Sequence, residues 1–483
     1  MASPLPDIKL VLLLPEIGLS LLAMTLLLMS AWLGKESRGR IATWAIAGIA
    51  LVAFAMVSLS SGVPPSTTLG GHFIDDQLAR FMKLLLLVAT AFPLLMAGDF
   101  LRQHALESGE YFVLSLFSLL GAMTMVSAGS FLVLYLGLEL MSLPIYVLAA
   151  YQRDQLRSSE AGLKYFVLGS LASGILLYGI SLVYGATGTT VIHDVATILK
   201  AADHVSPVAV MGAAFVVIGI SFKVAAAPFH MWAPDVYEGA PTPVTAFIAI
   251  MPKIAAFSAF FRVLFEGFAT LQGHWGPMLQ VMAVISLAVG SLGAIAQSNI
   301  KRLLAYSSIG HVGFLLIGLI TDNALGRQGV LFYLAIYIFM SLGAFCLVLV
   351  LNKGGVGDEI QNYAGLAKER PLLAFLMAVF MFSMAGIPPL GGFIAKLYVL
   401  MAAVHAGMIT LAVIAVLFSA IGAFYYLRIV KIIYFDPTCE PFAVKVGLSH
   451  QLVLLISALV VLGTGLFPGR LLAWTQATVQ SFL

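Results

Sequence analysis

The chain is a series of apolar segments of about twenty residues each, separated by short polar stretches. An apolar segment of about twenty residues is long enough to cross the hydrocarbon core of a bilayer as one helix. We predict about fourteen such spans, at residues 10–32, 41–62, 78–98, 111–129, 131–150, 160–185, 208–228, 242–266, 277–297, 303–320, 329–351, 371–400, 409–434 and 450–468. Because the stretches between them are too short to hold a soluble catalytic domain, the pattern predicts an all-α polytopic membrane protein.

Two spans, 7 and 12, contain residues that interrupt a helix. Span 7 runs into the string SFKVAAAPFHMWAP with Pro228, and span 12 contains MAGIPPLGGFIAK with Pro388 and Pro389. Proline cannot donate to a helical hydrogen bond, and a broken backbone at membrane depth persists only where protein or water satisfies it. Paired interruptions of this kind indicate an ion path in transporters built from inverted repeats.

The spacing of the interruptions agrees with such a repeat. Spans 4–8 (residues 111–266) and spans 9–13 (residues 277–434) cover 156 and 158 residues, and their breaks lie 160 residues apart. Five spans is an odd number, so the second copy enters the membrane from the opposite side. We therefore predict two inverted five-helix repeats with discontinuous helices 7 and 12. Outside them lie an N-terminal part with spans 1–3 (1–110) and a C-terminal part with span 14 (435–483).

Lysine and arginine collect in the loops on one side of the predicted bundle. They follow odd-numbered spans at Lys35, Arg38, Arg40, Arg102, Arg153, Arg157, Lys301, Arg302, Lys353, Lys368, Arg370, Lys431 and Lys445. In the loops that join an even-numbered span to the next span we find only Lys200 and Arg327. Because cytoplasmic loops carry the excess of positive charge, we expect these basic loops in the cytoplasm and both termini on the periplasmic side.

Composition supports the membrane assignment and removes several function classes. The chain has 483 residues, of which 61% are hydrophobic and 10% charged, and its mean hydropathy is +1.03. The net charge of +3 lies in short loops, so it gives no support to nucleic-acid binding. The two cysteines, Cys346 and Cys439, are isolated, and no HExxH, Walker A or GxGxxG string is present. We therefore predict no disulfide, metal, iron–sulfur or nucleotide site in this chain.

Four of the ionisable residues inside the predicted spans are the main candidates for function: Glu139, Lys223, Lys253 and Lys396. A charge at the centre of a membrane helix costs roughly 2.5–3.5 kcal/mol, so such groups pair with one another or line a hydrated path. A desolvated lysine, unlike an arginine, can exchange its proton near neutral pH. We interpret the four residues as a candidate proton relay, in which Lys253 is central and Lys396 is the last stop toward the periplasm.

Each of these residues also has a structural alternative. Glu139 could be a neutral carboxyl that is hydrogen-bonded within the bundle. Lys223 could extend to the interface, because it lies near the cytoplasmic end of its span. Lys253 lies about ten residues into its span, so the same explanation is poor for it.

Three further residues are weaker candidates. His230 and His311 have the intrinsic pKa for proton hopping between amines, although a lone histidine in a bundle is more often a structural hydrogen-bonder. Lys164 begins span 6 and could interact with Glu139, or could extend to the interface instead.

Other polar residues near span ends are expected to lie at the membrane surface. Tyr425 and Tyr426 fit interfacial anchors better than relay hydroxyls. Glu16 is early in the first span and is expected to be a shallow, solvated carboxylate. We assign the same interfacial place to Arg262 with Glu266, Arg428 with Lys431, and Asp75 with Asp76. The first span lacks the basic start of a signal peptide, so we expect it to be retained as a helix.

Four strings resemble the signatures of the antiporter-like subunits of respiratory complex I. They are YLGLELMSLPIYVL, FKVAAAPFHMWAPDVYEGAPTPVTAF, NIKRLLAYSSIGHVGFLL and MAGIPPLGGFIAKLYVL. The resemblance extends over the whole chain, and the second string is highly specific. Within the family the chain most resembles the N type. It stops after the last span, without the lateral helix of the L type, and it has Lys396 where the M type carries glutamate.

The resemblance implies a proton-translocating membrane subunit of a bacterial NADH–quinone oxidoreductase. Glu139 and Lys223 would form a switching pair, Lys253 and Lys396 the central and terminal relays, and the two histidines intermediate groups. Members of the family bind no cofactor themselves; NADH, FMN, iron–sulfur clusters and quinone are used by the whole complex. The implied partners are other membrane subunits, including other antiporter-like ones, in the bacterial inner membrane.

Two other functions remain open at the level of the sequence. A cation/proton antiporter subunit of the Mrp type has the same fold and the same glutamate and lysine signatures. A subunit that holds its neighbours and conducts nothing is also compatible, because buried charges can serve the specificity of helix packing.

Overall fold

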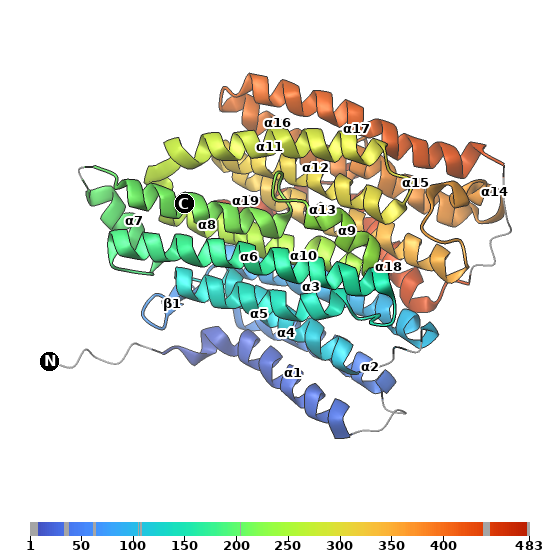
Figure 1. Cartoon of the computed structure of the whole chain (residues 1–483), viewed down its shortest axis with the longest axis horizontal. Coiled ribbons are helices and arrows are strands. Elements are labelled where there is room, and N and C mark those ends of the chain that lie inside the picture. Colours follow the sequence, from blue (N-terminus) through green and yellow to red (C-terminus); the bar gives the residue numbers. More distant parts are fainter. Residues whose placement is uncertain are drawn as a thin grey trace.

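The computed structural model describes residues 8–32, 38–60, 64–104, 106, 109–202, 204–437 and 445–480. Lys35 and Cys439, which were part of the sequence interpretation, lie outside these described residues. The long helices run side by side, parallel or antiparallel, as one bundle with α1 at one margin and α17 at the other (Figure 1).

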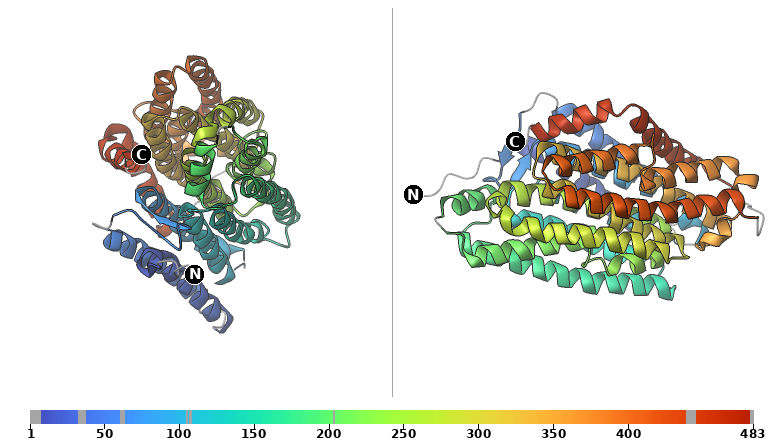
Figure 2. Two further views of the ribbon diagram at one scale, coloured as in Figure 1. Left: turned by 90° about the vertical axis from the view of Figure 1, so that its left-hand side faces the viewer. Right: turned by 90° about the horizontal axis from the view of Figure 1, so that it is seen from above.

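The N-terminal part contains three long helices and a short hairpin. Its elements are η1 (Leu10–Leu13), α1 (Leu14–Trp32), α2 (Arg38–Ser60), β1 (Ser66–Thr68), β2 (Phe73–Asp75) and α3 (Gln77–Gln103). The antiparallel pair β1–β2 is the one sheet among the described residues, and it is a small exception to the predicted all-α fold. Seen end-on, α1 and α2 lie at one edge of the bundle (Figure 2).

The rest of the chain forms the main bundle. The first predicted repeat contains α4 (Gly109–Val126), α5 (Phe131–Ala149), α6 (Leu156–Thr187), α7 (Ile192–Ala201), α8 (Pro207–Val224), α9 (Trp232–Gly239), α10 (Thr242–Phe260) and the π-helical turn η3 (Phe261–Gly267). The turn η4 (Ala269–Leu271) lies between the two predicted repeats. The second repeat contains α11 (Gln272–Ile295), α12 (Ile300–Ile320), α13 (Ala324–Lys353), η5 (Ile360–Tyr363), α14 (Leu366–Glu369), α15 (Pro371–Ala385), α16 (Gly391–His405) and α17 (Ile409–Phe435). The chain closes with α18 (Leu448–Leu466) and α19 (Gly469–Gln480).

The predicted number of spans is confirmed. Among the described residues, 13 helices are long and apolar enough to cross a membrane. The remaining predicted span, 371–400, corresponds to the two shorter apolar helices α15 and α16 placed one after the other. The short elements α7 and β1 lie at one end of the bundle and α14 at the other (Figure 1).

Both predicted discontinuities are present, and both begin with a left-handed residue. Ala225 (φ 59°) ends α8, and Gly386 (φ 86°) ends α15. A left-handed residue at this place stops a helix and satisfies carbonyls of its last turn. Two candidate amines flank the breaks from opposite sides, because Lys223 precedes the first break and Lys396 follows the second.

The two halves of the main bundle share a way of packing their first two helices. Helices α4 and α5 cross so closely that a Cβ built on Gly121 would lie 2.2 Å from the Met141 nitrogen. Helices α11 and α12 cross in the same manner, since a Cβ on Gly290 would lie 2.4 Å from the Gly310 nitrogen. The two halves therefore resemble each other in these crossings. The boundaries of the predicted repeats remain a prediction.

Burial separates central helices from peripheral ones. The most apolar window of α10 is 100% buried, and those of α12 and α13 are 89% and 94% buried, against 28% for α1. A helix that is apolar on every side belongs in the interior. Lys253 on α10 and His311 on α12 therefore lie in the most enclosed part of the protein.

Candidate functional site

Lys223 is buried between α8 and α5, with 2% of its surface exposed. Its Nζ atom donates hydrogen bonds to Ser142 Oγ at 2.9 Å and to the Tyr146 hydroxyl at 3.0 Å. Both acceptors are neutral, and both lie on the face of α5 that also carries Glu139, because residues three and seven positions apart share one side of a helix. The amine is thus held by hydroxyls one and two turns from the carboxylate.

Glu139 is close enough to Lys223 to act on it through space. No ion pair joins them, however, although the structure describes both residues, so the expected direct pair is absent in this arrangement. The Oε1 atom of Glu139 is buried and has no hydrogen-bond partner among the described residues. An unsatisfied buried carboxylate oxygen is costly, and it leaves Glu139 able to bind an incoming donor.

Lys253 lies in the centre of the bundle with 1% of its surface exposed. Its Nζ atom donates to the Tyr237 hydroxyl at 2.9 Å and to the Ala249 carbonyl at 3.0 Å. The Tyr337 hydroxyl donates to the same carbonyl at 3.4 Å, and it shares a hydrogen bond of 2.7 Å with Ser308 Oγ. Hydroxyl groups therefore extend from the central amine onto α12 and α13.

His311 follows Ser308 on α12 and is held at both ring nitrogens. Nδ1 lies 2.7 Å from the Tyr333 hydroxyl, and Nε2 lies 3.2 Å from the Tyr426 hydroxyl. Tyr426 is also hydrogen-bonded to Ser307. Lys253 and Lys396 are both close enough to His311 to act on the imidazole through space.

Lys396 on α16 reaches back over the second break. Its Nζ atom donates to the Ala385 carbonyl at 2.8 Å and to Ser419 Oγ on α17 at 3.1 Å, and it lies 5.0 Å from the centre of the Phe314 ring. The side chain crosses Gly386 so closely that a Cβ there would lie 2.8 Å from Lys396 Cδ. Glycine at this position therefore both ends α15 and admits the amine.

Of the three weaker candidates, His230 and Lys164 lie away from this core. His230 is half-buried in the first break, beside the Pro228 carbonyl. Lys164 is 41% exposed and forms ion pairs of 2.7 Å with Glu160 and Asp235, not with Glu139.

The ion pairs of Lys164 belong to a charged cluster at one end of the bundle. Asp235 also pairs with Arg302 at 2.6 Å, and Arg302 pairs with Glu238 at 3.0 Å. Partial burial raises the pKa of Asp235, but hydrogen bonds from Lys164 and Arg302 outweigh it and hold that pKa below its usual value. The cluster lines a small cavity of about 210 Å³.

A second group of buried cations has acidic partners. In the sequence these residues were either not singled out or expected at the membrane surface. Lys83, which was not singled out, is 1% exposed and pairs at 2.7 Å with Glu16. Glu16 is 7% exposed, so its expected place as a solvated carboxylate is wrong. Arg262 is 1% exposed and binds Asp76 in a bidentate manner at 2.6 and 2.7 Å. Arg262, which was expected near a span end at the membrane surface, is enclosed by protein beside Asp76, the residue that precedes α3.

The tyrosines near the end of span 13 are likewise not at the surface. Tyr425 and Tyr426 are 4% and 2% exposed, so the prediction of interfacial anchors is wrong. Helix α17 continues to Phe435, which leaves Tyr426 more than two turns inside its end. The hydroxyls of Tyr237, Tyr333 and Tyr337 and of three serines were missed because no charge marks them in the sequence; the serines are Ser142, Ser308 and Ser419.

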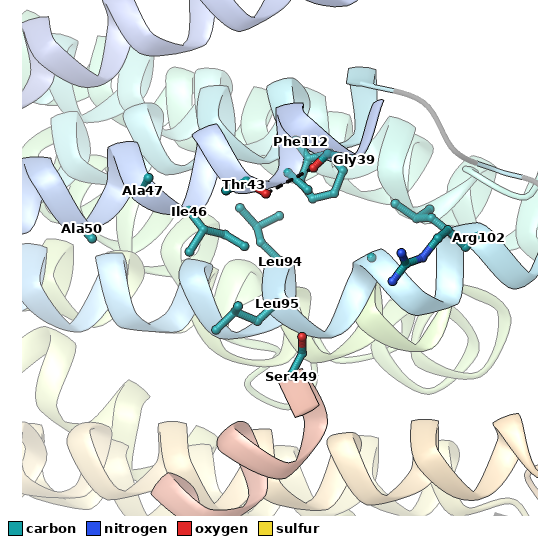
Figure 3. Close-up of a pocket in the computed structure, with 13 residues that line it drawn as sticks. Gly39, Thr43, Ile46, Ala47, Ala50, Leu94, Leu95, Arg102, Phe112 and Ser449 are labelled. Atoms are coloured by element: carbon teal, nitrogen blue, oxygen red, sulfur yellow. Dashed lines mark hydrogen bonds between the residues drawn. The ribbon is translucent and has the colours of Figure 1, made fainter. Parts of the chain in front are cut away.

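Two larger cavities open elsewhere on the bundle. A polar cavity of about 540 Å³ opens at the end of the bundle that carries the basic loops, where Lys301 hydrogen-bonds the Ala240 carbonyl at 3.1 Å. An apolar cavity of about 490 Å³ lies between α2, α3 and α18, with Arg102 and Ser449 at its rim (Figure 3). None of the candidate relay side chains lines either one.

The described residues contain no group of three histidine, cysteine, aspartate or glutamate side chains that could hold a metal ion. Cys346 is a buried free thiol, and its Sγ atom lies 3.7 Å from the His450 carbonyl. The polar groups described above are amines, an imidazole, a carboxyl and hydroxyls, all of which can exchange protons.

Known proteins resemble the chain over nearly its whole length. The family model described as "NADH:quinone oxidoreductase/Mrp antiporter, TM" matches residues 128–422, which include all seven site residues that were predicted from the sequence. A relative from Magnetococcus marinus, named NADH-quinone oxidoreductase subunit N, is 55% identical over 484 residues and covers 100% of each chain.

Solved structures agree with these sequence matches. A chain of respiratory complex I from Thermus thermophilus is 31% identical, with a TM-score of 0.81 over 95% of this chain and 98% of that one. A chain of the Mrp complex from Dietzia is 22% identical, with a TM-score of 0.85 over 98% and 97% of the two chains. The second likeness concerns the fold alone.

Proposed function

The chain belongs to the NADH:quinone oxidoreductase/Mrp antiporter membrane family and, within it, to the subunit N proteins, and from this premise we propose that its relay residues move protons across the membrane. Electron transfer from NADH to quinone, in other subunits of the oxidoreductase, would drive this movement. The chain itself would bind no cofactor, and NADH, FMN, iron–sulfur clusters and quinone would belong to the rest of the complex.

One observation carries the proposal: three deeply buried lysines have only neutral partners. Lys223, Lys253 and Lys396 are 2%, 1% and 8% exposed, and each donates only to hydroxyls or carbonyls among the described residues. Lys83 and Arg262, which are equally buried, have carboxylates within 2.7 Å. A buried ammonium without a counter-ion is unstable and readily gives up its proton, so the three unpaired amines are suited to carry one.

The proposed sequence of steps uses the order of these groups through the bundle. A charge change near Glu139 alters its attraction for the Lys223 ammonium, which then releases its proton toward Lys253. The proton passes by way of His311 to Lys396 and leaves on the far side. Moving one charge against the membrane potential requires about 2.3 kcal/mol per 100 mV, which the loss of one partly buried charge interaction can supply.

The orientation and setting are part of the proposal. The basic loops would face the cytoplasm, so the polar cavity beside Lys301 would open there and both termini would lie in the periplasm. The membrane would be the bacterial inner membrane. The partners would be other membrane subunits of the oxidoreductase, including other antiporter-like subunits.

A second candidate, cation/proton exchange of the Mrp type, is favoured by the shared fold with the Dietzia chain. The two functions differ in their driving reaction. Proton transport driven by NADH oxidation supports the oxidoreductase, whereas sodium-dependent transport without NADH oxidation supports the antiporter. A purely structural subunit is not favoured, because three unpaired buried amines weaken a scaffold without serving it.

The test replaces the central amine in the assembled complex. In sealed membrane vesicles, Lys253→Ala is expected to leave the amount of complex unchanged and to lower NADH-driven proton uptake by at least about a hundredfold, the scale of a lost proton-transfer group. Lys200→Ala is the matched control, since Lys200 is an exposed lysine of the same half of the chain. Normal uptake in the Lys253 variant, at normal assembly, would exclude the proposal.

A further inference from the structure

Helix α17 brings two hydroxyl groups to the ends of the gap between His311 and Lys396. Ser419 Oγ accepts a hydrogen bond from Lys396 Nζ at 3.1 Å. The Tyr426 hydroxyl lies 3.2 Å from His311 Nε2. One helix thus touches both the imidazole and the terminal amine, and neither contact was expected from the sequence.

The two hydroxyls lie on one face of α17. They are seven residues apart, which is close to two turns and about 10.5 Å along the helix axis. Between them on this face lies Gly422, which is buried and carries no side chain. The ring of Tyr425 and Ser291 Oγ of α11 lie beside Gly422, at ordinary contact distances of 3.6 Å from the Cβ that a side chain would add. The strip of α17 from Ser419 to Tyr426 therefore presents hydroxyls at both ends and leaves room for a small group such as water at Gly422.

The hydrogen bonds of His311 suit proton transfer through the ring. A neutral imidazole has one donor and one acceptor nitrogen, so one of Tyr333 and Tyr426 donates to the ring while the other accepts from it. A proton taken up at one nitrogen and released at the other exchanges the tautomer. Rotation of the two hydroxyls then restores the starting arrangement, because each hydroxyl can both donate and accept.

We propose that α17 carries the proton between His311 and Lys396, with the hydroxyls of Tyr426 and Ser419 as carriers. Nε2–H of His311 gives its proton to the Tyr426 oxygen, and Tyr426 releases its own proton to the first of a short chain of water molecules beside Gly422. The last water of that chain gives a proton to the Ser419 oxygen, and Ser419 gives its own to neutral Lys396, which becomes the ammonium. Each group gains one proton and loses one, so the hydroxyls are unchanged afterwards. This step rests on the relay proposed above.

The position of Ser419 agrees with the predicted repeats. Helix α17 ends the second repeat as α10 ends the first. Ser419 is the eleventh residue of α17, and Lys253 is the twelfth residue of α10. In the second half, a hydroxyl therefore stands near the place that the central amine occupies in the first.

The experiment compares hydroxyl deletions with hydroxyl-preserving and unrelated changes. In sealed vesicles containing the assembled complex, Tyr426→Phe and Ser419→Ala are expected to lower NADH-driven proton uptake by about tenfold and to raise the solvent deuterium isotope effect on turnover. Ser419→Thr keeps the hydroxyl and is expected to retain uptake. Thr410→Ala is a control on the same helix, because it deletes a hydroxyl of α17 that lies on an exposed residue.

The outcomes separate this proposal from the function it rests on. Normal uptake and an unchanged isotope effect in Tyr426→Phe and Ser419→Ala would overturn it, while Lys253→Ala in the same preparation still loses uptake. Equal losses in Ser419→Ala and Ser419→Thr would also overturn it, because packing and not the hydroxyl would then matter. If Lys253→Ala keeps full uptake, the failure lies in the proposed function. Should Tyr426→Phe fail to assemble, the pair of Ser419 variants decides.

Discussion

The ammonium of Lys223 donates to Ser142 Oγ at 2.9 Å, and Ser142 lies one helical turn after Glu139 on α5. The amine and the carboxylate thus share a helix face without forming a direct ion pair. A neutral hydroxyl beside an ammonium stabilises it less than a carboxylate does. A modest change of charge near Glu139 can therefore shift the protonation equilibrium of Lys223.

The hydroxyls beside Lys223 give the first prediction. In Ser142→Ala and Tyr146→Phe the ammonium loses a hydrogen bond of about 1 kcal/mol, so NADH-driven proton uptake should fall by about fivefold. Uptake into sealed vesicles, normalised to assembled complex, measures the effect. Ser115→Ala is the control, because the Ser115 hydroxyl donates a hydrogen bond within its own helix, to the Tyr111 carbonyl. Full uptake in both variants would contradict this role.

The buried pair of Glu16 and Lys83 gives a prediction about stability. Lys83→Met leaves a carboxylate buried without its partner and should destabilise the chain by about 3–5 kcal/mol. Adding Glu16→Leu should restore most of the assembled complex, since replacing both charges removes the unpaired one. Native gels and the unfolding temperature measure both variants. Loss of turnover per assembled complex in the double variant would show that the pair does more than hold α1 against α3.

The crossing of α11 and α12 gives a prediction with a control in the same helix. Gly290→Ala should lower the yield and unfolding temperature of the complex, because its Cβ would lie 2.4 Å from a backbone nitrogen. Gly276→Ala meets no atom within 4 Å and should raise stability by about 0.5–1 kcal/mol. Equal behaviour of the two variants would mean that the helices can move apart without loss.

The pKa of Asp76 gives a prediction about acid. Burial raises this pKa, but the charge and hydrogen bonds of Arg262 outweigh burial and lower it below the ordinary value. Its contribution to stability is therefore complete above the pKa of an unfolded aspartate, near 3.9, and is lost as the pH falls through the lower folded pKa.

Asp76→Asn removes this contribution. The variant should be less stable at neutral pH, and it should lose less stability between about pH 4 and about pH 2 than the parent does. The fraction of this chain that remains in the solubilised complex, followed over that range, measures both effects. A parallel decline of variant and parent would show that another group controls acid stability.

The spans and their interruptions could be predicted because each is a local property of the sequence. Twenty apolar residues form a span wherever they occur, and Pro388 with Pro389 must break one. Short elements such as the β1–β2 hairpin and α7 were missed, because three-residue strands and a ten-residue surface helix carry little periodic signal. Charge inside a span likewise marked Lys223, Lys253 and Lys396 without any knowledge of their neighbours.

The partners of these groups could not be predicted, because they depend on how distant helices pack. Lys83 and Arg262 carry the same charge as the relay amines, and only the structure shows that acidic residues of other segments neutralise them. Tyr426 was placed at the interface because tyrosines near a span end commonly lie there. The neighbour that gives it a role, His311, is 115 residues away in the chain.

Lys223→Ala tests whether an unpaired buried amine moves the proton. NADH–quinone electron transfer, proton uptake into sealed vesicles and the amount of assembled complex are recorded on the same membranes. We expect normal assembly, with electron transfer and proton uptake lost together. Normal electron transfer and uptake at normal assembly would contradict it, and normal NADH oxidation with loss of sodium/proton exchange would favour the antiporter function instead.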